Sequence, residues 1–280
     1  MTVSAQLPPV KERYELKYMI PREMVEPITR FISPYCSMDA FSARTEGNFY
    51  PVNSLYFDTR GLEFLKQRLW GKESRFNMRA RAYGNGDAPP YFLEIKHKTG
   101  TCVKKYRTTL SDGEWPRILA DPMYRCADID DPVQRRNKEL FLRLAMSYAI
   151  EPKILTSYRR RAFFSTVNDY ARVTMDIDLC YQLEEGYNLS PDARSVYYNN
   201  QTIFSGNEHS FATENYGPGR VILELKCNIG QTPSWMLDLV ASFEPKQVGF
   251  SKYANSTLVA RIDNGDTYMD PAVQGLLLAY

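Results

Sequence analysis

The stretch Tyr91–Lys98, which reads YFLEIKHK, indicates how this chain folds. Side chains alternate between the two faces of an extended strand, so every second residue shares a face. One face of this stretch is largely apolar, whereas the other carries a carboxylate and two ammonium groups, from Glu94, Lys96 and Lys98. A single face of this kind is usually a solvated surface, so the stretch alone does not indicate a site.

The same alternation recurs in three other stretches. Each has charged residues two positions apart between apolar neighbours: RYELKY at 13–18, MRARAY at 78–83 and VILELK at 221–226. Four charged strand faces favour one shared interior over four unrelated surfaces. Such an interior would be a polar lumen, because charges that point inward need partners or water.

The composition bounds the class of protein. The chain has 280 residues, of which 44% are hydrophobic and 24% charged, and its 20 Tyr and 14 Phe favour strands. No apolar run approaches the roughly 18–20 residues that cross a bilayer, and Met1–Pro9 lacks the pattern of a signal peptide. Five scattered cysteines without a CxxC pair fit a reducing compartment. We therefore expect a cytoplasmic protein with no transmembrane segment of its own.

Periodicity predicts about eight strands with helices between them. The expected strands are Lys11–Ile20, Tyr50–Asp58, Arg75–Tyr83, Tyr91–Lys98, Val103–Leu110, Ile154–Thr166, Ala171–Leu179 and Val221–Asn228. The expected helices are Pro21–Ile32, Thr59–Trp70, Pro132–Ile150, Pro233–Ser242 and Ser251–Ile262. The segment Glu184–Gly219 is rich in Asn, Ser, Tyr and Gly, which predicts a hairpin excursion or a mobile loop.

This order of elements predicts the α+β fold class. We expect a closed antiparallel β-barrel or tunnel of about eight strands, with a charged lumen and with the helices packed outside. Tyr91–Lys98 and Arg75–Tyr83 should form an antiparallel pair, because GNGDAPP between them has the composition of a turn. We expect a single domain over residues 1–280, with its core at about 12–262.

Charge is concentrated in one part of the chain. Between Lys66 and Arg107, 11 Lys or Arg accompany three acids, so this segment has a net charge of +8 while the whole chain has +2. That segregation predicts a local anion site. The chain has only two histidines, His97 and His209. A bound metal would therefore be held by carboxylates, which favour Mg²⁺ or Mn²⁺.

The usual backbone motifs for phosphate are absent. The sequence has no GxxxxGK[ST], and its short Gly84-Asn85-Gly86 is typical of a turn. Side chains would have to bind a polyanion. Arginines give bidentate contacts to phosphate and lysines add point charges, which makes candidates of Arg79, Arg81, Lys17, Lys96, Lys104 and Lys226.

Two interpretations of these charges stay open at this point. The interleaved carboxylates of Glu15, Glu94 and Glu224 could pair with the cations in ladders that only stabilise the sheet. They could instead hold a metal ion beside an anion channel. Arg160 is the middle residue of Arg159-Arg160-Arg161, so it faces opposite its neighbours on a strand. Periodicity does not decide which of the two faces points inward.

Eight short stretches, in order, resemble the VTC domain. This domain is the polyphosphate polymerase module of the vacuolar transporter chaperone family, within the triphosphate tunnel metalloenzymes. The stretches are RYELKY, YPVNSLYFDT, MRARAY, FLEIKHK, VKKYR, SYRRRAF, VILELK and FSKY, and the resemblance runs from about Glu12 to Ile262. It implies a closed antiparallel tunnel, in agreement with the expected lumen.

The resemblance also implies roles for individual residues. Those it implies as phosphate-binding are Lys17, Arg79, Arg81, Lys96, Lys104, Arg160, Lys226 and Lys252. Glu224 would be the main ligand of Mn²⁺ or Mg²⁺, and Glu15 and Glu94 are further carboxylates that could join it. Catalysis would depend on Arg160, Glu224 and Lys96.

The activity implied by the resemblance is metal-dependent synthesis of polyphosphate. The terminal phosphoryl group of ATP would pass to a growing inorganic polyphosphate chain. No nucleic-acid partner is expected, and a membrane protein could be a partner. Arg13 stands where hydrolytic tunnel enzymes have a second glutamate, which favours the polymerase. Gly249 stands where the eukaryotic catalytic subunit has a lysine. The alternatives are a tunnel-type triphosphatase, which hydrolyses inorganic triphosphate or nucleoside triphosphates, and a non-catalytic polyanion-binding module.

Overall fold

The computed structural model describes residues 13–100, 102–125, 129–197 and 220–263. Its strands are β1 Arg13–Pro21, β2 Cys36–Met38, β3 Tyr50–Asp58, β4 Ser74–Tyr83, β5 Tyr91–Thr99, β6 Cys102–Leu110, β7 Glu151–Ser165, β8 Ala171–Leu183, β9 Val196–Tyr197, β10 Arg220–Asn228 and β11 Lys246–Gln247. The α-helices are α1 Val25–Ile32, α2 Ala40–Arg44, α3 Glu63–Leu69, α4 Arg117–Ala120, α5 Pro132–Tyr148, α6 Ser234–Phe243 and α7 Lys252–Asp263. Short 3₁₀ helices occupy Arg22–Met24, Glu46–Asn48 and Asp112–Glu114.

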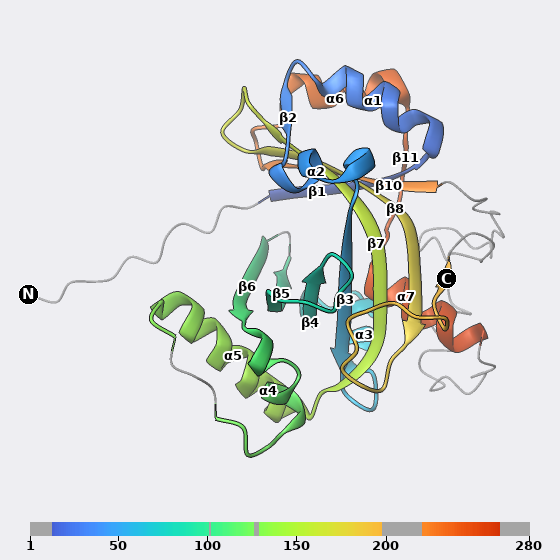
Figure 1. Cartoon of the computed structure of the whole chain (residues 1–280). Helices are drawn as coiled ribbons and strands as arrows, with labels where there is room; N and C mark the ends of the chain where they lie inside the picture. Colours follow the sequence, from blue (N-terminus) through green and yellow to red (C-terminus); the bar gives the residue numbers. More distant parts are fainter. Residues whose placement is uncertain (1–12, 101, 126–128, 198–219, 264–280) are drawn as a thin grey trace, which may run out of the picture.

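All the strands belong to one antiparallel sheet (Figure 1). Its main path runs β11-β1-β10-β8-β7-β3-β4-β5-β6, while β2 pairs with β7 and β9 with β8. The eight long strands are those predicted from periodicity, and the pairing of β4 with β5 is confirmed. The three short strands β2, β9 and β11 were not predicted, because two or three residues are too few to show alternation.

The prediction of a closed barrel is wrong for the described residues. The strand path ends at β11 on one side and at β6 on the other, and no backbone ladder joins the two ends. The sheet instead curls until side chains meet across the gap. Lys96 of β5 lies 2.7 Å from Glu15 of β1, although five strands separate β1 and β5 along the path. The lumen is thus closed on this side by an ion pair instead of backbone hydrogen bonds.

Helices cover the outer face of the sheet in two places (Figure 1). α1 and α6 pack together over β1, β8 and β10, and they bury Ile28, Trp235 and Leu239. α5 lies on β5 and β6, where Phe141 is 1% exposed. Asp131 caps α5, since its carboxylate accepts from the N–H groups of the first turn.

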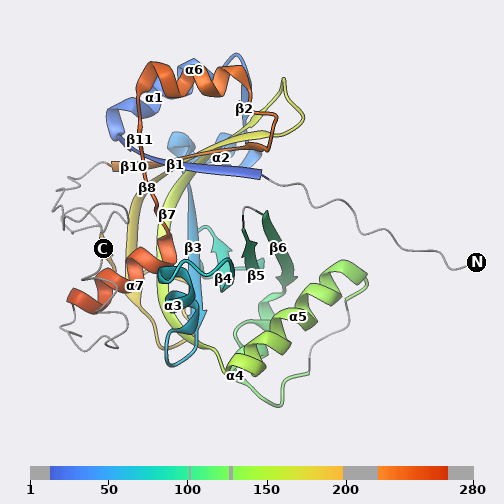
Figure 2. The same ribbon diagram turned by 180° about the vertical axis from the view of Figure 1, so that it is seen from behind.

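α7 departs from the prediction that the helices pack outside. It packs with α3 beside β7 and β8, as Figure 2 shows from behind. Tyr253 and Leu258 of α7 join a core cluster with Tyr56 and Tyr158, which lie on the same strand faces as the charged residues. α7 therefore fills part of the concave face of the sheet, so the lumen is narrower than that of an open barrel.

Asp58 joins strand β3 to both of these helices. Its fully buried carboxylate accepts hydrogen bonds from the N–H groups of Thr59, Phe64 and Leu65 and from the Tyr253 hydroxyl. The helix predicted from Thr59 begins later, at Glu63, after Leu62 in the left-handed conformation. The Thr59 hydroxyl nevertheless accepts from the Glu63 N–H, in the manner of a cap.

Much of the long polar segment lies outside the described residues. Within the predicted loop Glu184–Gly219, residues 184–195 form no strand or helix and β9 pairs with β8, whereas residues 198–219 are not described. In the described ranges no helix has the length and apolar character to cross a membrane.

Candidate functional site

The charged faces of the long strands meet in one network inside the curled sheet. Nine cations lie within 3.9 Å of four carboxylates, which are Glu15, Glu94, Asp176 and Glu224. The cations are Lys17, Arg79, Arg81, Lys96, Lys105, Arg107, Arg160, Lys226 and Lys252. The shared interior predicted from four alternating stretches is thus present.

Glu94 anchors the wall made by β4, β5 and β6. Its carboxylate is 1% exposed and lies 2.6 Å from Arg79 and from Lys105, as well as 3.4 Å from Arg107 and 3.9 Å from Arg81. Burial opposes ionisation, but Arg79 and Arg81 outweigh it and hold the pKa of Glu94 well below its ordinary value. The Glu94 carboxylate is therefore ionised, and four cations surround it.

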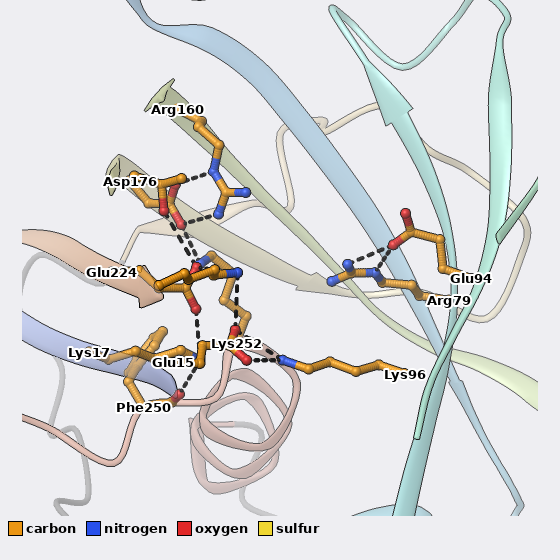
Figure 3. A network of polar contacts seen from close by, with 12 residues as sticks. Glu15, Lys17, Arg79, Glu94, Lys96, Arg160, Asp176, Glu224, Phe250 and Lys252 are labelled. Atoms are coloured by element: carbon orange, nitrogen blue, oxygen red, sulfur yellow. Dashed lines mark hydrogen bonds and ion pairs between the residues drawn. The ribbon is translucent and has the colours of Figure 1, made fainter. Parts of the chain in front are cut away.

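The opposite wall carries a second cluster on β1 and β10 (Figure 3). Lys226 lies 3.2 Å from Glu15 and 3.1 Å from Glu224, and Lys17 lies 3.8 Å from Glu224 and donates to the Phe250 carbonyl. Lys96 reaches this cluster from β5 through its ion pair with Glu15. The nearby cations hold the pKa of buried Glu224 well below its ordinary value, against the effect of desolvation.

Arg160 and Lys252 share a third carboxylate. The guanidinium of Arg160 donates two hydrogen bonds to Asp176, of 2.7 and 2.8 Å, and Lys252 lies 2.5 Å from the same group. Asp176 is 1% exposed, and although burial favours its neutral form these cations lower its pKa to about 2. Lys252 begins α7, as predicted. The structure thus answers the open question about Arg160, which faces inward.

The structure brings together every predicted site residue except Lys104. In the β5–β6 pair Lys96 lies opposite Lys105, whereas Lys104 lies opposite His97 on the outer face. The prediction that Lys104 lines the lumen is therefore wrong. The next residue, Lys105, faces the lumen instead.

A family model for the VTC domain matches residues 12–261. The chain belongs to the VTC domain family. This match confirms the resemblance that the eight stretches suggested. No curated protein matches the chain.

Solved structures from other proteins are similar to this VTC domain at low sequence identity. A candidate adenylate cyclase from Bacillus halodurans is 14% identical, with a TM-score of 0.46, and the match covers 86% of this chain and 94% of that one. A candidate adenylyl cyclase from Hippeastrum, described as having a dominant triphosphatase activity, is 12% identical with a TM-score of 0.42 and coverages of 86% and 93%. A protein from Pyrococcus horikoshii is 10% identical with a TM-score of 0.41 and coverages of 90% and 99%.

Sequence reasoning missed several residues of this lumen. Asp176 belongs to the alternating stretch ARVTMDIDL and lies on the face that carries Arg172 and Thr174, so period two could have identified it. Tyr158 lies beneath the ammonium group of Lys252, 4.4 Å from ring centroid to Nζ, and its hydroxyl accepts from Arg81. No sequence pattern distinguishes such a tyrosine from a core residue.

The difference between neighbouring lysines gives a first prediction. Lys105→Ala should weaken the binding of inorganic triphosphate by about 5- to 30-fold, the loss of one charge-assisted contact worth roughly 1–2 kcal/mol. Lys104→Ala is the matched control, and its affinity should stay within about twofold of wild type. Isothermal titration calorimetry measures both, and an equal loss in the two variants would contradict the register.

Two lysines with lowered pKa values give a second prediction, which concerns pH. Burial lowers the pKa of Lys17 to about 8 and that of Lys105 to about 7, although nearby carboxylates oppose the shift. The folded protein therefore releases these protons at lower pH than the unfolded chain. Stability without ligand should rise between about pH 7 and pH 9, since the unfolded chain binds more protons there. The affinity for polyanions should fall over the same range.

Thermal unfolding with and without inorganic triphosphate at pH 6.5 and 8.5 tests this pair of trends. The melting temperature of the free protein should rise with pH, and the increase caused by triphosphate should shrink. The double variant Lys17→Gln, Lys105→Gln is the control for changes in the charge of triphosphate itself, which affect both proteins equally. Its melting temperatures, with and without triphosphate, should depend less on pH than those of the wild type. Identical profiles for the variant and the wild type would contradict the assignment.

Proposed function

We propose that this VTC domain is a metal-dependent polyphosphate polymerase. It would transfer the terminal phosphoryl group of ATP to a growing inorganic polyphosphate chain inside the basic lumen. The observation that carries the proposal is the charge imbalance of the interior, where nine cations accompany four carboxylates. A salt-bridge ladder that only stabilised a sheet would be close to balanced, since uncompensated buried charge is unfavourable.

The cations of this network come from several strands. Cations come from both walls, with Arg79 on β4, Arg160 on β7 and Lys226 on β10. A long anion with a charge at every repeating unit matches such a surface better than a compact one does. Polyphosphate and the triphosphate of a nucleotide share this chemistry, so donor and acceptor could occupy one lumen end to end.

The available bases favour a phosphate acceptor over water. The lumen carboxylates are paired with cations, and the lowered pKa values of Glu94, Asp176 and Glu224 make them weak bases. His97 is the one histidine within the described ranges, and it faces outward opposite Lys104. A polyphosphate end is already ionised and needs no protein base, whereas water does need to be activated.

The carboxylates Glu15 and Glu224 fit the divalent ion that the family implies. They lie on the adjacent strands β1 and β10, and one ammonium group, that of Lys226, contacts both. No group of three or more metal-binding side chains is found in the described part of the chain. This fits Mg²⁺ or Mn²⁺, which proteins often hold through one or two carboxylates together with substrate phosphates. When bound, the ion would neutralise charge on the phosphate oxygens.

The lumen side chains would act by positioning and by charge. A terminal oxygen of the acceptor forms the new bond to the γ-phosphorus of ATP, while the bond from that phosphorus to the bridging oxygen of the β-phosphate breaks and ADP leaves. Negative charge spreads over the transferring group, where Arg160 and Lys252 would stabilise it. Arg79, Arg81 and Lys96 would align the phosphates. Asp176 keeps Arg160 and Lys252 together before the substrate binds.

The ratio of products separates this proposal from the triphosphatase. Purified protein with ATP and Mn²⁺ should release ADP with much less than one free phosphate per ADP, because the phosphate enters the polymer. A triphosphatase releases one phosphate for each ADP. Equal amounts of the two products at all times would overturn the polymerase proposal and favour hydrolysis.

A further inference from the structure

An aromatic cluster stands beside the phosphate-binding cations. Phe41 of α2 stacks on Tyr83 with ring centroids 6.0 Å apart and an interplanar angle of 14°, and it lies 5.8 Å from Tyr50. Tyr83 in turn contacts Phe92, with centroids 5.6 Å apart. Phe41 is nevertheless 65% exposed. One large aromatic face is thus presented to solvent at the edge of a charged lumen.

The exposed ring is held firmly. α2 has only five residues, but Asp39 caps it by accepting from the Ser42 N–H. Ser42 is fully buried, and its hydroxyl accepts from the Ala162 N–H on β7. The helix is therefore tied to the sheet at the residue next to Phe41. A ring fixed in this way is pre-organised to stack, because little entropy is lost on binding.

Cations adjoin the cluster on the lumen side. Arg107 lies over the ring of Phe92, 3.6 Å from its centroid, and its guanidinium donates to the Tyr83 hydroxyl. Tyr50 pairs with Arg160 across β3 and β7. A planar aromatic group that rests on Phe41 would therefore have an attached phosphate chain directed toward these guanidinium groups.

At the other end of the β4–β5 pair, the residues that face the lumen are polar or charged. These residues are Arg75 and Asn77 on β4 and Lys96 and Lys98 on β5. Burial and the neighbouring Arg75 lower the pKa of Lys98, as expected where cations crowd together. This end suits phosphate alone. The two ends of the strand pair thus differ in chemistry, one aromatic and one basic.

We propose that the aromatic cluster of Phe41, Tyr50, Tyr83 and Phe92 binds the base of the donor nucleotide, and that the phosphates point from there toward Lys96. The inference rests on the proposed use of a nucleoside triphosphate, and it adds where and how the nucleoside is held. Stacking accepts any base, because every base has a π-face. ATP and GTP should therefore bind with similar affinity.

Two ligands test the cluster, a non-hydrolysable ATP analogue and inorganic triphosphate, with affinities measured by isothermal titration calorimetry. Phe41→Ala should weaken the analogue by about 5- to 150-fold, the range for one stacked base, and leave inorganic triphosphate within about twofold. Phe41→Trp should bind the analogue at least as tightly as wild type. Leu237→Ala is the matched control, since Leu237 is 59% exposed on α6, and it should change neither affinity.

The outcomes distinguish this inference from the proposed function. Equal weakening of both ligands by Phe41→Ala would overturn the inference, because it would mean that Phe41 supports the lumen. Unchanged affinity for both ligands would overturn it as well. If Phe41→Ala weakens binding of the analogue as described but the wild-type protein makes no polyphosphate, the polymerase proposal is refuted. The inference of a base-binding site is still supported in that case.

Discussion

Glu224→Gln should reduce metal-dependent turnover by about 100-fold or more, the range for the loss of one electrostatic element of a site. Glu224 is 5% exposed and is the most buried of the carboxylates on the β1–β10 wall. Glutamine keeps its volume and removes its charge. Removing a negative charge beside Lys17 and Lys226 should not weaken phosphate binding. The expected signature is lost turnover with affinity for inorganic triphosphate equal to or above that of wild type.

A matched control separates this effect from lost stability. Glu184 is also 5% exposed, and it pairs with Arg194 at 3.0 Å outside the lumen. Glu184→Gln should retain turnover, even where its melting temperature falls. If the protein only binds polyanions and catalyses no reaction, its affinity for inorganic triphosphate should instead be independent of metal. Both variants should then keep the wild-type affinity. Full turnover by Glu224→Gln would contradict the assigned role.

Arg160→Ala is the second large effect expected. Arg160 donates two hydrogen bonds to Asp176 and points into the lumen, so it is positioned before the substrate arrives. We expect kcat to fall about 100- to 1,000-fold, as when one preorganised donor to a transition state is removed. The affinity for the ATP analogue should fall much less, since eight other lumen cations remain.

The neighbour Arg159 provides the control for this variant. It faces outward and pairs with Asp178 at 3.7 Å, with 44% of its side chain exposed. Arg159→Ala should leave kcat within about twofold of wild type. If Arg160→Ala weakened the analogue as strongly as it lowered kcat, Arg160 would be a binding residue and not a group that stabilises the transferring phosphoryl.

Alternation was sufficient to predict the long strands. β3 has the predicted bounds Tyr50–Asp58, and the charged faces of β1, β4, β5 and β10 converge as expected. This success has a simple cause, because a charged residue at every second position is rare unless one strand face is polar throughout. Most of the candidate site followed from that single pattern together with the family resemblance.

Consecutive cations are where the pattern fails. In Val103–Arg107 two lysines are adjacent, so period two allows either Lys104 or Lys105 to face inward. The register decides, and it depends on the tight turn that pairs Thr99 with Cys102, with Gly100 at φ +57. The turn TGTC has no strong sequence signal for its length. A shift of one residue reverses every side chain of the strand.

The closure of the sheet was also beyond sequence reasoning. Whether β1 meets β6 through backbone hydrogen bonds depends on the curl summed over nine strands, and small differences in twist at each strand accumulate. The same holds for α7, whose apolar residues Tyr253 and Leu258 fit either an outer or an inner face. Their contact partners, Tyr56 and Tyr158, come from strands far away in the sequence.

Phosphorus NMR of the reaction with ATP and Mn²⁺ tests the central claim most directly. The signal of internal phosphoanhydride phosphorus should grow in step with ADP, and this growth should be lost in Glu224→Gln. A reaction in which orthophosphate is the only new phosphate species beside ADP would contradict the proposed polymerase activity.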